Sequence, residues 1–185
     1  MKFEDGDLVF IRNNTTFYTI LTSVSSGISH VSMIYNNNNE LYLSSMSRIT
    51  NKCIHEPISK LNKWNYVKII RLNPPLTHKE KQILQDQCKK STDYCLLPYL
   101  STKKCTNCTQ HVLKMLRQIN KAPESSSNWV LPNSILNLPH TVIFEKGTSY
   151  DVPVLIMMIM IIMIIMIIMI IMIIIIIYSK HLSIK

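Results

Sequence analysis

Residues 104–116 have the sequence KCTNCTQHVLKML, which predicts a loop that leads into an α-helix. From Cys108 onward, apolar residues recur at helical spacing: Val112, Leu113, Leu116 and Ile119. Cys108 therefore lies in the first turn. A thiol at a helix N-terminus is close to unpaired backbone N–H groups and to the positive end of the helix dipole, and both favour the thiolate. We expect Cys108 to be a nucleophile.

Three lysines near this cysteine favour the thiolate in the same way: Lys103, Lys104 and Lys114. A nucleophilic cysteine also needs a base, which in a folded protein usually comes from a distant part of the sequence. The candidate is His30, which lies in an expected strand over 27–35. The remaining histidines are expected to be surface or packing residues: His55, His78, His111, His140 and His181. Met33 and Met115 are expected in the core rather than as ligands.

The order of the predicted elements indicates an α+β domain with a small antiparallel sheet and packed helices. Strands are expected over 7–12, 27–35, 40–44, 49–55, 66–72 and 141–144. Two helices follow the fifth strand. The first begins with the capping-box spacing of Thr77 and Glu80, and the second runs from Cys108 to about Ile119. The run of asparagines at 36–39 is expected to form a turn.

The five cysteines indicate reduced thiols, since an odd count at irregular spacing does not suggest a disulfide framework. Cys105 and Cys108 have the spacing of half a zinc site or of a redox pair. No second Cys-x-x-Cys or His-x-x-x-His follows, and a structural zinc ion needs four ligands. We therefore expect neither a metal nor a cofactor.

Leu155–Ile177 is an unbroken run of Leu, Ile and Met, long enough to cross a bilayer as a helix of about 35 Å at about 1.5 Å per residue. We expect a catalytic domain over 1–150, a transmembrane helix over 153–178 and a polar tail over 179–185. The N-terminus lacks the features of a signal peptide, so the expected topology is tail-anchored and single-pass, with the N-terminal domain in the cytosol.

An alternative interpretation of the apolar run is that it has no role. The Met-Ile-Ile register has a period of three, which matches neither a helix face nor a heptad, and it is typical of an expanded AT-rich repeat. No motif of small residues predicts a tight helix dimer.

The chain carries a formal net charge of +9. Seven lysines and arginines but only one acidic residue lie between Lys89 and Lys121, which favours contact with the anionic headgroups of a membrane. A nucleic-acid partner is not expected, because no stacking aromatic residues alternate with the lysines and no nucleic-acid motif is present.

Four segments carry a resemblance, in this order along the chain: Gly6–Ile11 (GDLVFI), Ser29–Ile34 (SHVSMI), Cys108–Val112 (CTQHV) and Leu131–Leu136 (LPNSIL). Together they resemble the circularly permuted, papain-like branch of the NlpC superfamily. This group contains YiiX/YaeF-like hydrolases, related poxvirus proteins and lecithin retinol acyltransferase-like enzymes. The match covers roughly residues 5–145. The acyltransferase-like branch is the near alternative, although its distinctive His-Trp is missing here because Val31 follows His30.

The resemblance implies a thiol hydrolase or acyltransferase with Cys108 as nucleophile and His30 as base. It favours Cys108 over Cys105, because only Cys108 is followed by Thr109 and Val112 in the family's register. A third polar residue, usually Glu or His, orients the histidine in the family. Here that position falls on Ser44, with Glu40 or Ser45 as alternatives if the strand register differs. A hydroxyl accepts a hydrogen bond from imidazole but adds no negative charge.

The expected function is therefore that of a membrane-anchored cysteine hydrolase, an amidase, peptidase or acyl-ester hydrolase that works by Cys-His acyl transfer. Its substrate would be an acyl, peptide or lipid molecule. Its second partner would be the lipid bilayer, which would be a host or virion membrane if the chain is viral. The alternative is a catalytically inactive, membrane-anchored binding or scaffold protein of the same fold. The serine at the third position makes this alternative credible.

Overall fold

The computed structural model describes residues 2–12, 27–47, 49–90, 92–95, 105–123, 131–147 and 162–171. The chain divides into two compact units, Met1–Ser149 and Tyr150–Lys185. The first unit contains every predicted strand and the helix that starts at Cys108. In the second unit, 162–171 is helical.

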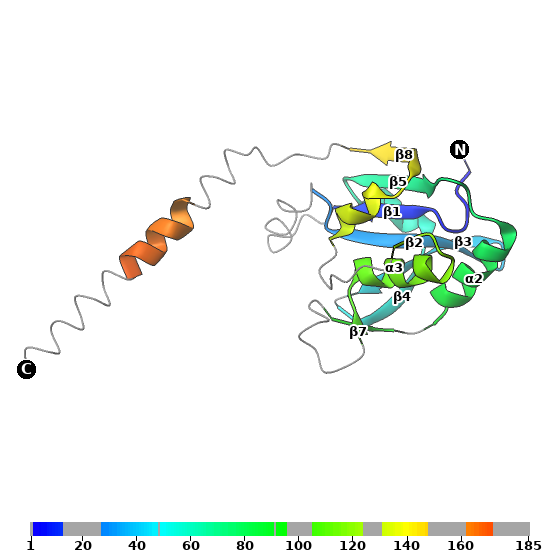
Figure 1. Ribbon diagram of the computed structural model, residues 1–185, viewed down its shortest axis with the longest axis horizontal. Helices are drawn as coiled ribbons and strands as arrows, with labels where there is room; N and C mark the ends of the chain where they lie inside the picture. Colours follow the sequence, from blue (N-terminus) through cyan, green and yellow to red (C-terminus); the bar gives the residue numbers. More distant parts are fainter. Residues whose placement is uncertain are drawn as a thin grey trace, which may run out of the picture. The chain divides into compact units, whose positions relative to one another are not determined.

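The first unit is built on one sheet of eight described strands in the order β7-β6-β4-β3-β2-β1-β5-β8 (Figure 1). The strands are β1 (Leu8–Ile11), β2 (His30–Asn37), β3 (Glu40–Ser47), β4 (Lys52–Pro57), β5 (Val67–Leu72), β6 (Asp93–Tyr94), β7 (Cys105–Thr106) and β8 (His140–Lys146). All neighbours pair antiparallel except β6 and β7, which are parallel. The predicted α+β class is confirmed, with a larger sheet than expected.

Four described helices accompany this sheet. They are the α-helices α2 (His78–Cys88) and α3 (Cys108–Gln118) and the 3-10 helices η1 (Ile58–Lys63) and η3 (Pro132–Asn137). Figure 1 shows α2 and α3 against the middle of the sheet, where both contact β2. The predicted capping box is present at the start of α2, where the Thr77 hydroxyl accepts from the Glu80 backbone N–H and the Glu80 carboxylate accepts from that of Thr77.

The core lies on both faces of the sheet, because successive side chains of a strand point to opposite sides. On one face, Val31, Met33 and Tyr35 pack with the buried residues of α2 and α3. On the other face, Ile34 packs with Leu43 and with residues of β5 and η1. Met33 and Met115 are both buried in the first cluster, as predicted.

A buried ion pair fixes the start of the chain to β5. The side chain of Asp7 is only 1% exposed, and the Arg71 guanidinium binds it through Nε at 2.8 Å and Nη2 at 2.9 Å. Arg71 also contacts Glu4, which Lys81 of α2 holds at 2.7 Å. Because both carboxylates are satisfied by cations, the segment that leads into β1 is held beside the sheet.

Strand β3 is longer than the sequence indicates. It was expected to end at Ser44, and it continues to Ser47 because it pairs with β4 through Ser47 and Lys52. The segment Ser44–Ser47 contains no β-branched residue, so its extended conformation comes from this pairing rather than from local preference. The turn between β2 and β3 forms at the asparagines as predicted, with Asn38 and Asn39 at φ 53° and 65°.

Candidate active site

Cys108 is the first residue of α3. The preceding residue, Asn107, caps the helix, because its side-chain oxygen accepts a hydrogen bond from the backbone N–H of Gln110 at 2.9 Å. Cys108 is a free cysteine, and the residue is half-buried. The local sequence therefore places this sulfur at the positive end of a well-formed helix, as predicted.

His30 is the first residue of β2, and its side chain interacts with the Cys108 thiol through a hydrogen bond. Burial by itself raises the pKa of this thiol. The charge and the hydrogen bond of His30, the backbone N–H of Val31 and the hydroxyl of Thr109 outweigh burial, so the pKa of Cys108 is lowered from the ordinary cysteine value. The two predicted residues, 78 positions apart in the sequence, meet at one site.

The meeting point lies where β2 and β3 separate. The pairing of β2 with β3 ends at Met33 and Ser44, whereas β2 continues along β1 as far as His30. Beyond that last pair, β3 follows β4 instead. The backbone N–H of Val31 is therefore available to the sulfur of Cys108 at this point.

Ser45 is the residue that contacts the ring of His30. Its Oγ lies 2.6 Å from His30 Nε2, and it also accepts a hydrogen bond from Ser32 Oγ at 3.1 Å. Both serines are buried. Ser45, which the sequence offered as an alternative to Ser44, is therefore the serine that contacts His30.

Ser44, the first choice from sequence, contacts a different histidine. Its Oγ lies 3.3 Å from Nε2 of His111 and 3.5 Å from the sulfur of Cys53. The residue predicted to contact His30 is thus wrong by one position along β3. Adjacent residues of a strand face opposite sides of the sheet, so Ser44 points away from the side on which Ser45 meets His30. Glu40, the other alternative, lies at the start of β3, where its carboxylate accepts a hydrogen bond from Tyr42.

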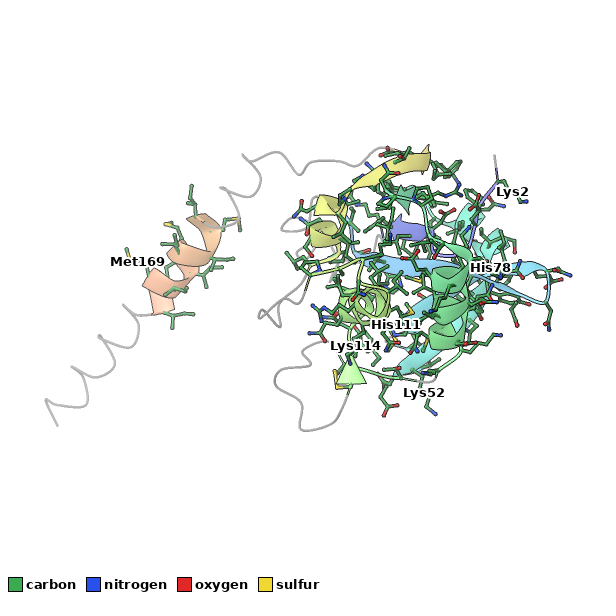
Figure 2. The ribbon with its side chains drawn as sticks, turned by 45° about the vertical axis from the view of Figure 1, so that its right-hand side comes forward. Lys2, Lys52, His78, His111, Lys114 and Met169 are labelled. Atoms are coloured by element: carbon green, nitrogen blue, oxygen red, sulfur yellow. A yellow bond between two sulfur atoms is a disulfide. The ribbon has the colours of Figure 1, made fainter. Side chains whose placement is uncertain are left out.

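His111 is a buried residue whose ring makes polar contacts. It lies on α3 and is only 5% exposed (Figure 2). Its Nε2 contacts Ser44 and lies 3.7 Å from the sulfur of Cys53. Burial lowers its pKa to about 4, and the charges of Lys114, His55 and His30 act in the same direction. The ring is therefore neutral near pH 7. The sequence signal that could have drawn attention to His111 is its position three residues after Cys108, which places the two side chains on neighbouring parts of one helix surface.

The other free cysteines are not activated. Burial raises the pKa of the Cys53 thiol, against which a hydrogen bond from Ser44 acts only in part. Burial also raises the pKa of Cys88 to about 12, and the Cys88 thiol contacts the sulfur of Met115 at 3.6 Å. Among the three free cysteines, only Cys108 has a pKa shifted toward the thiolate.

The expectation of five reduced thiols is wrong for two of them. Cys95 and Cys105 form a disulfide with their Cα atoms 5.6 Å apart. Cys105 lies in β7, three residues before Cys108, and its sulfur is bonded to Cys95 rather than to Cys108. Among the described residues, no group of three His, Cys, Asp or Glu side chains could hold a metal ion.

The cations around the site are only partly described. Lys114 lies on α3 (Figure 2), where partial desolvation and the charge of Arg117 lower its pKa. Lys103, Lys104 and His181 lie outside the described residues. Of the other histidines, His55 is exposed and contacts the ring of Tyr35. His140 donates a hydrogen bond from Nδ1 to the carbonyl oxygen of Leu138 at 2.8 Å.

The apolar run belongs to the second unit. Its described part, 162–171, is a helix in which every side chain is at least 50% exposed. Within the residues that the structure describes, no helix is both long and apolar enough to cross a membrane. The rest of the predicted span lies outside the described residues.

Comparison with known proteins links the chain by fold alone. No family model matches it, and no curated protein matches it. Five solved chains match, among them the metalloprotein YiiX from Escherichia coli O157:H7. The superposition has a TM-score of 0.64 and covers 78% of this chain and 98% of YiiX, at 14% sequence identity. The fold is therefore similar to that of a YiiX-like protein, in keeping with the predicted resemblance, whereas membership of the permuted papain-like branch stays a prediction.

Proposed function

We propose that the first unit is a thiol hydrolase or acyltransferase with Cys108 as nucleophile and His30 as general base and acid. The observation that carries this proposal is the interaction of His30 with a free thiol at a helix start, which lowers the pKa of that thiol against the effect of its burial. A YiiX-like fold is consistent with a hydrolase.

The chemistry begins when the Cys108 thiolate attacks a carbonyl carbon and forms a tetrahedral intermediate. The backbone N–H of Cys108, at the start of α3, is a donor for the developing oxyanion. His30 then gives its proton to the leaving alcohol or amine, which departs and leaves a thioester on Cys108. His30 next removes a proton from water or from a second acceptor, whose attack on the thioester releases the acyl group and restores the thiol.

Ser45 is the residue that orients His30 in this scheme. A hydroxyl can accept from Nε2–H in both the neutral ring and the imidazolium, which leaves Nδ1 to take up and return the proton of Cys108 in both halves of the reaction. It brings no negative charge and therefore stabilises the imidazolium less than a carboxylate would.

A thiol-reactive acyl probe tests the enzyme against the inactive scaffold that Ser45 also favours. We expect covalent labelling of Cys108 in the full chain, detected by mass spectrometry of peptides, and its loss in His30→Ala. Labelling of Cys108 no faster than that of Cys53 or Cys88 would establish the scaffold. An array of amide and ester substrates on the active protein then decides the substrate class.

We further propose that the second unit binds a bilayer through Leu155–Ile177, with the first unit on the cytosolic side. The support is the run itself and the exposure of every described side chain in it, since exposed Ile and Met of this number require an apolar partner. Flotation of the full chain with phospholipid vesicles tests this. Met166→Lys places a charge near the centre of the run, which costs roughly 3 kcal/mol in a bilayer and should reduce flotation. If the wild type and Met166→Lys float equally well, or if neither floats, the proposal that Leu155–Ile177 binds the bilayer is refuted.

A further inference from the structure

One strand of the sheet contacts both elements that carry the proposed catalytic pair. Ser44 and Ser45 are consecutive residues of β3, so their side chains point to opposite faces. Ser45 Oγ lies 2.6 Å from Nε2 of His30 on β2, and Ser44 Oγ lies 3.3 Å from Nε2 of His111 on α3. Strand β3 therefore holds the base on one side and the helix of the nucleophile on the other.

We propose that Ser44 and His111 are positioning residues, whose hydrogen bond sets the first turn of α3 so that the Cys108 sulfur meets His30. This inference rests on the proposed function, in which Cys108 and His30 perform the chemistry. It assigns a role to two residues that do not themselves touch the reacting atoms.

The geometry of the helix supports this role. His111 follows Cys108 by three residues, which places the two side chains one turn apart on neighbouring parts of the helix surface. A bond from His111 to the sheet thus restricts both the rotation and the translation of the turn that carries Cys108. Ser44 is fully buried and His111 is 5% exposed, so water does not compete for this bond.

The position of Ser44 in the sheet adds to the argument. It belongs to the last pair between β2 and β3, opposite Met33, just before the two strands separate. The contact with His111 is therefore made next to the point at which β2 and β3 separate. A shift of α3 along β3 would change the separation of those two groups directly.

The charge state of His111 is compatible with this task. A neutral imidazole bonds to the hydroxyl of Ser44 without placing a second positive charge near His30. The sulfur of Cys53 on β4 contacts both partners of this hydrogen bond, Ser44 at 3.5 Å and Nε2 of His111 at 3.7 Å. Removal of the Cys53 thiol leaves the hydrogen bond between Ser44 on β3 and His111 on α3 in place.

The experiment measures the rate of iodoacetamide alkylation of Cys108 between pH 5 and 9 in the full chain. In Ser44→Ala and His111→Leu, we expect the apparent pKa of Cys108 to rise toward that of a free cysteine and the rate at pH 7 to fall at least about tenfold. In His111→Gln, the amide can accept from Ser44, and part of the rate should return. Cys53→Ala and the exposed-site variant Gln118→Ala are matched controls that should keep the wild-type profile.

The outcomes separate this inference from the proposed function. If Cys108 of the wild-type protein reacts no faster than Cys53, both the proposed function and this inference are refuted. If wild-type Cys108 is activated, and folded Ser44→Ala and His111→Leu keep its pH profile, only the inference fails. Should His111→Leu not fold by circular dichroism, Ser44→Ala and His111→Gln decide by the same criterion.

Discussion

The hydroxyl of Ser45 is buried and lies 2.6 Å from Nε2 of His30. A short contact between a buried hydroxyl and an imidazole fixes the orientation of the ring. The pair thus determines which nitrogen of His30 faces the thiol. The predictions below follow from this arrangement and from the interactions that hold it in place.

Ser45→Ala should reduce the reactivity of Cys108 without unfolding the protein. The change removes the partner of Nε2, and loss of one buried hydrogen bond of this kind costs about 1–3 kcal/mol, or roughly five- to 150-fold in rate. The measurement is the rate of acyl-probe labelling at Cys108 near pH 7. Ser45→Thr keeps the hydroxyl and should keep most of the rate, and a rate in Ser45→Ala equal to wild type would contradict the assignment.

The three free cysteines should react with alkylating agents in a fixed order. The pKa of Cys108 is lowered by His30, whereas burial raises the pKa of Cys53 and takes that of Cys88 to about 12. Because the thiolate is the reactive form, Cys108 should react first as pH is raised from 5, then Cys53, then Cys88 only on unfolding. Peptide mass spectrometry after timed alkylation gives the order, and Cys88 ahead of Cys108 would exclude the described site.

The folded protein should lose stability as pH falls from about 6.5 toward 4, through His111. Burial holds the pKa of His111 at about 4 in the folded state, while the unfolded chain has the ordinary value near 6.5. Between these two pKa values the unfolded state binds one more proton than the folded state. Each pH unit of acidification in that window therefore lowers the free energy of unfolding by up to about 1.4 kcal/mol.

The measurement for His111 is urea unfolding at pH 7 and at pH 4.5. His111→Gln cannot take up the proton, and it should show a smaller loss between the two pH values than wild type. A matched control is His78→Gln, which changes an exposed histidine at the start of α2. Equal losses in all three proteins would mean that His111 is not buried in the neutral form.

Arg71→Met should be strongly destabilising, because it leaves the carboxylate of Asp7 buried without its cation. Removing one partner of a buried ion pair typically costs about 3–5 kcal/mol. The double variant Asp7→Asn, Arg71→Met should recover part of that loss. Lys68→Met breaks the half-exposed pair of Lys68 with Glu145 at 3.6 Å and should cost below about 1 kcal/mol. Thermal unfolding of the four proteins provides the comparison.

The disulfide of Cys95 with Cys105 should stabilise the segment that leads into α3. Its sequence separation of 10 corresponds to about 3 kcal/mol of loop-closure entropy in the unfolded chain. A reductant should therefore lower the melting temperature of wild type, and the double variant Cys95→Ser, Cys105→Ser should be insensitive to it. Cys53→Ser, which keeps the disulfide, should respond as wild type does, and no response in wild type would show that the pair is already reduced.

Several features of the site depend on local sequence and were predictable from it. Asn107 and the apolar spacing after Cys108 specify a capped helix start, because capping and helical periodicity involve residues within two turns. The alternation around His30 specifies a strand for a similar reason. The apolar run after Pro153 is recognisable from its composition alone, and its role in a membrane stays a prediction.

Other features depend on contacts between distant segments. The sequence could not distinguish Ser44 from Ser45, because a shift of one residue in the register of β3 exchanges the two faces, and that register is set by pairing with β4. The disulfide of Cys95 likewise depends on β6 and β7 lying side by side, which no spacing of cysteines specifies.

The sequence by itself determined that Cys108 starts a helix and that His30 lies in a strand. Only the tertiary structure decided that Ser45 is the serine that contacts His30, and that His111 of α3 contacts Ser44 of the neighbouring strand. The physical reason is that helix starts and strand alternation arise from interactions between near neighbours in the chain. The partners of a buried hydrogen bond are instead fixed by strand register and helix packing, which are properties of the whole sheet.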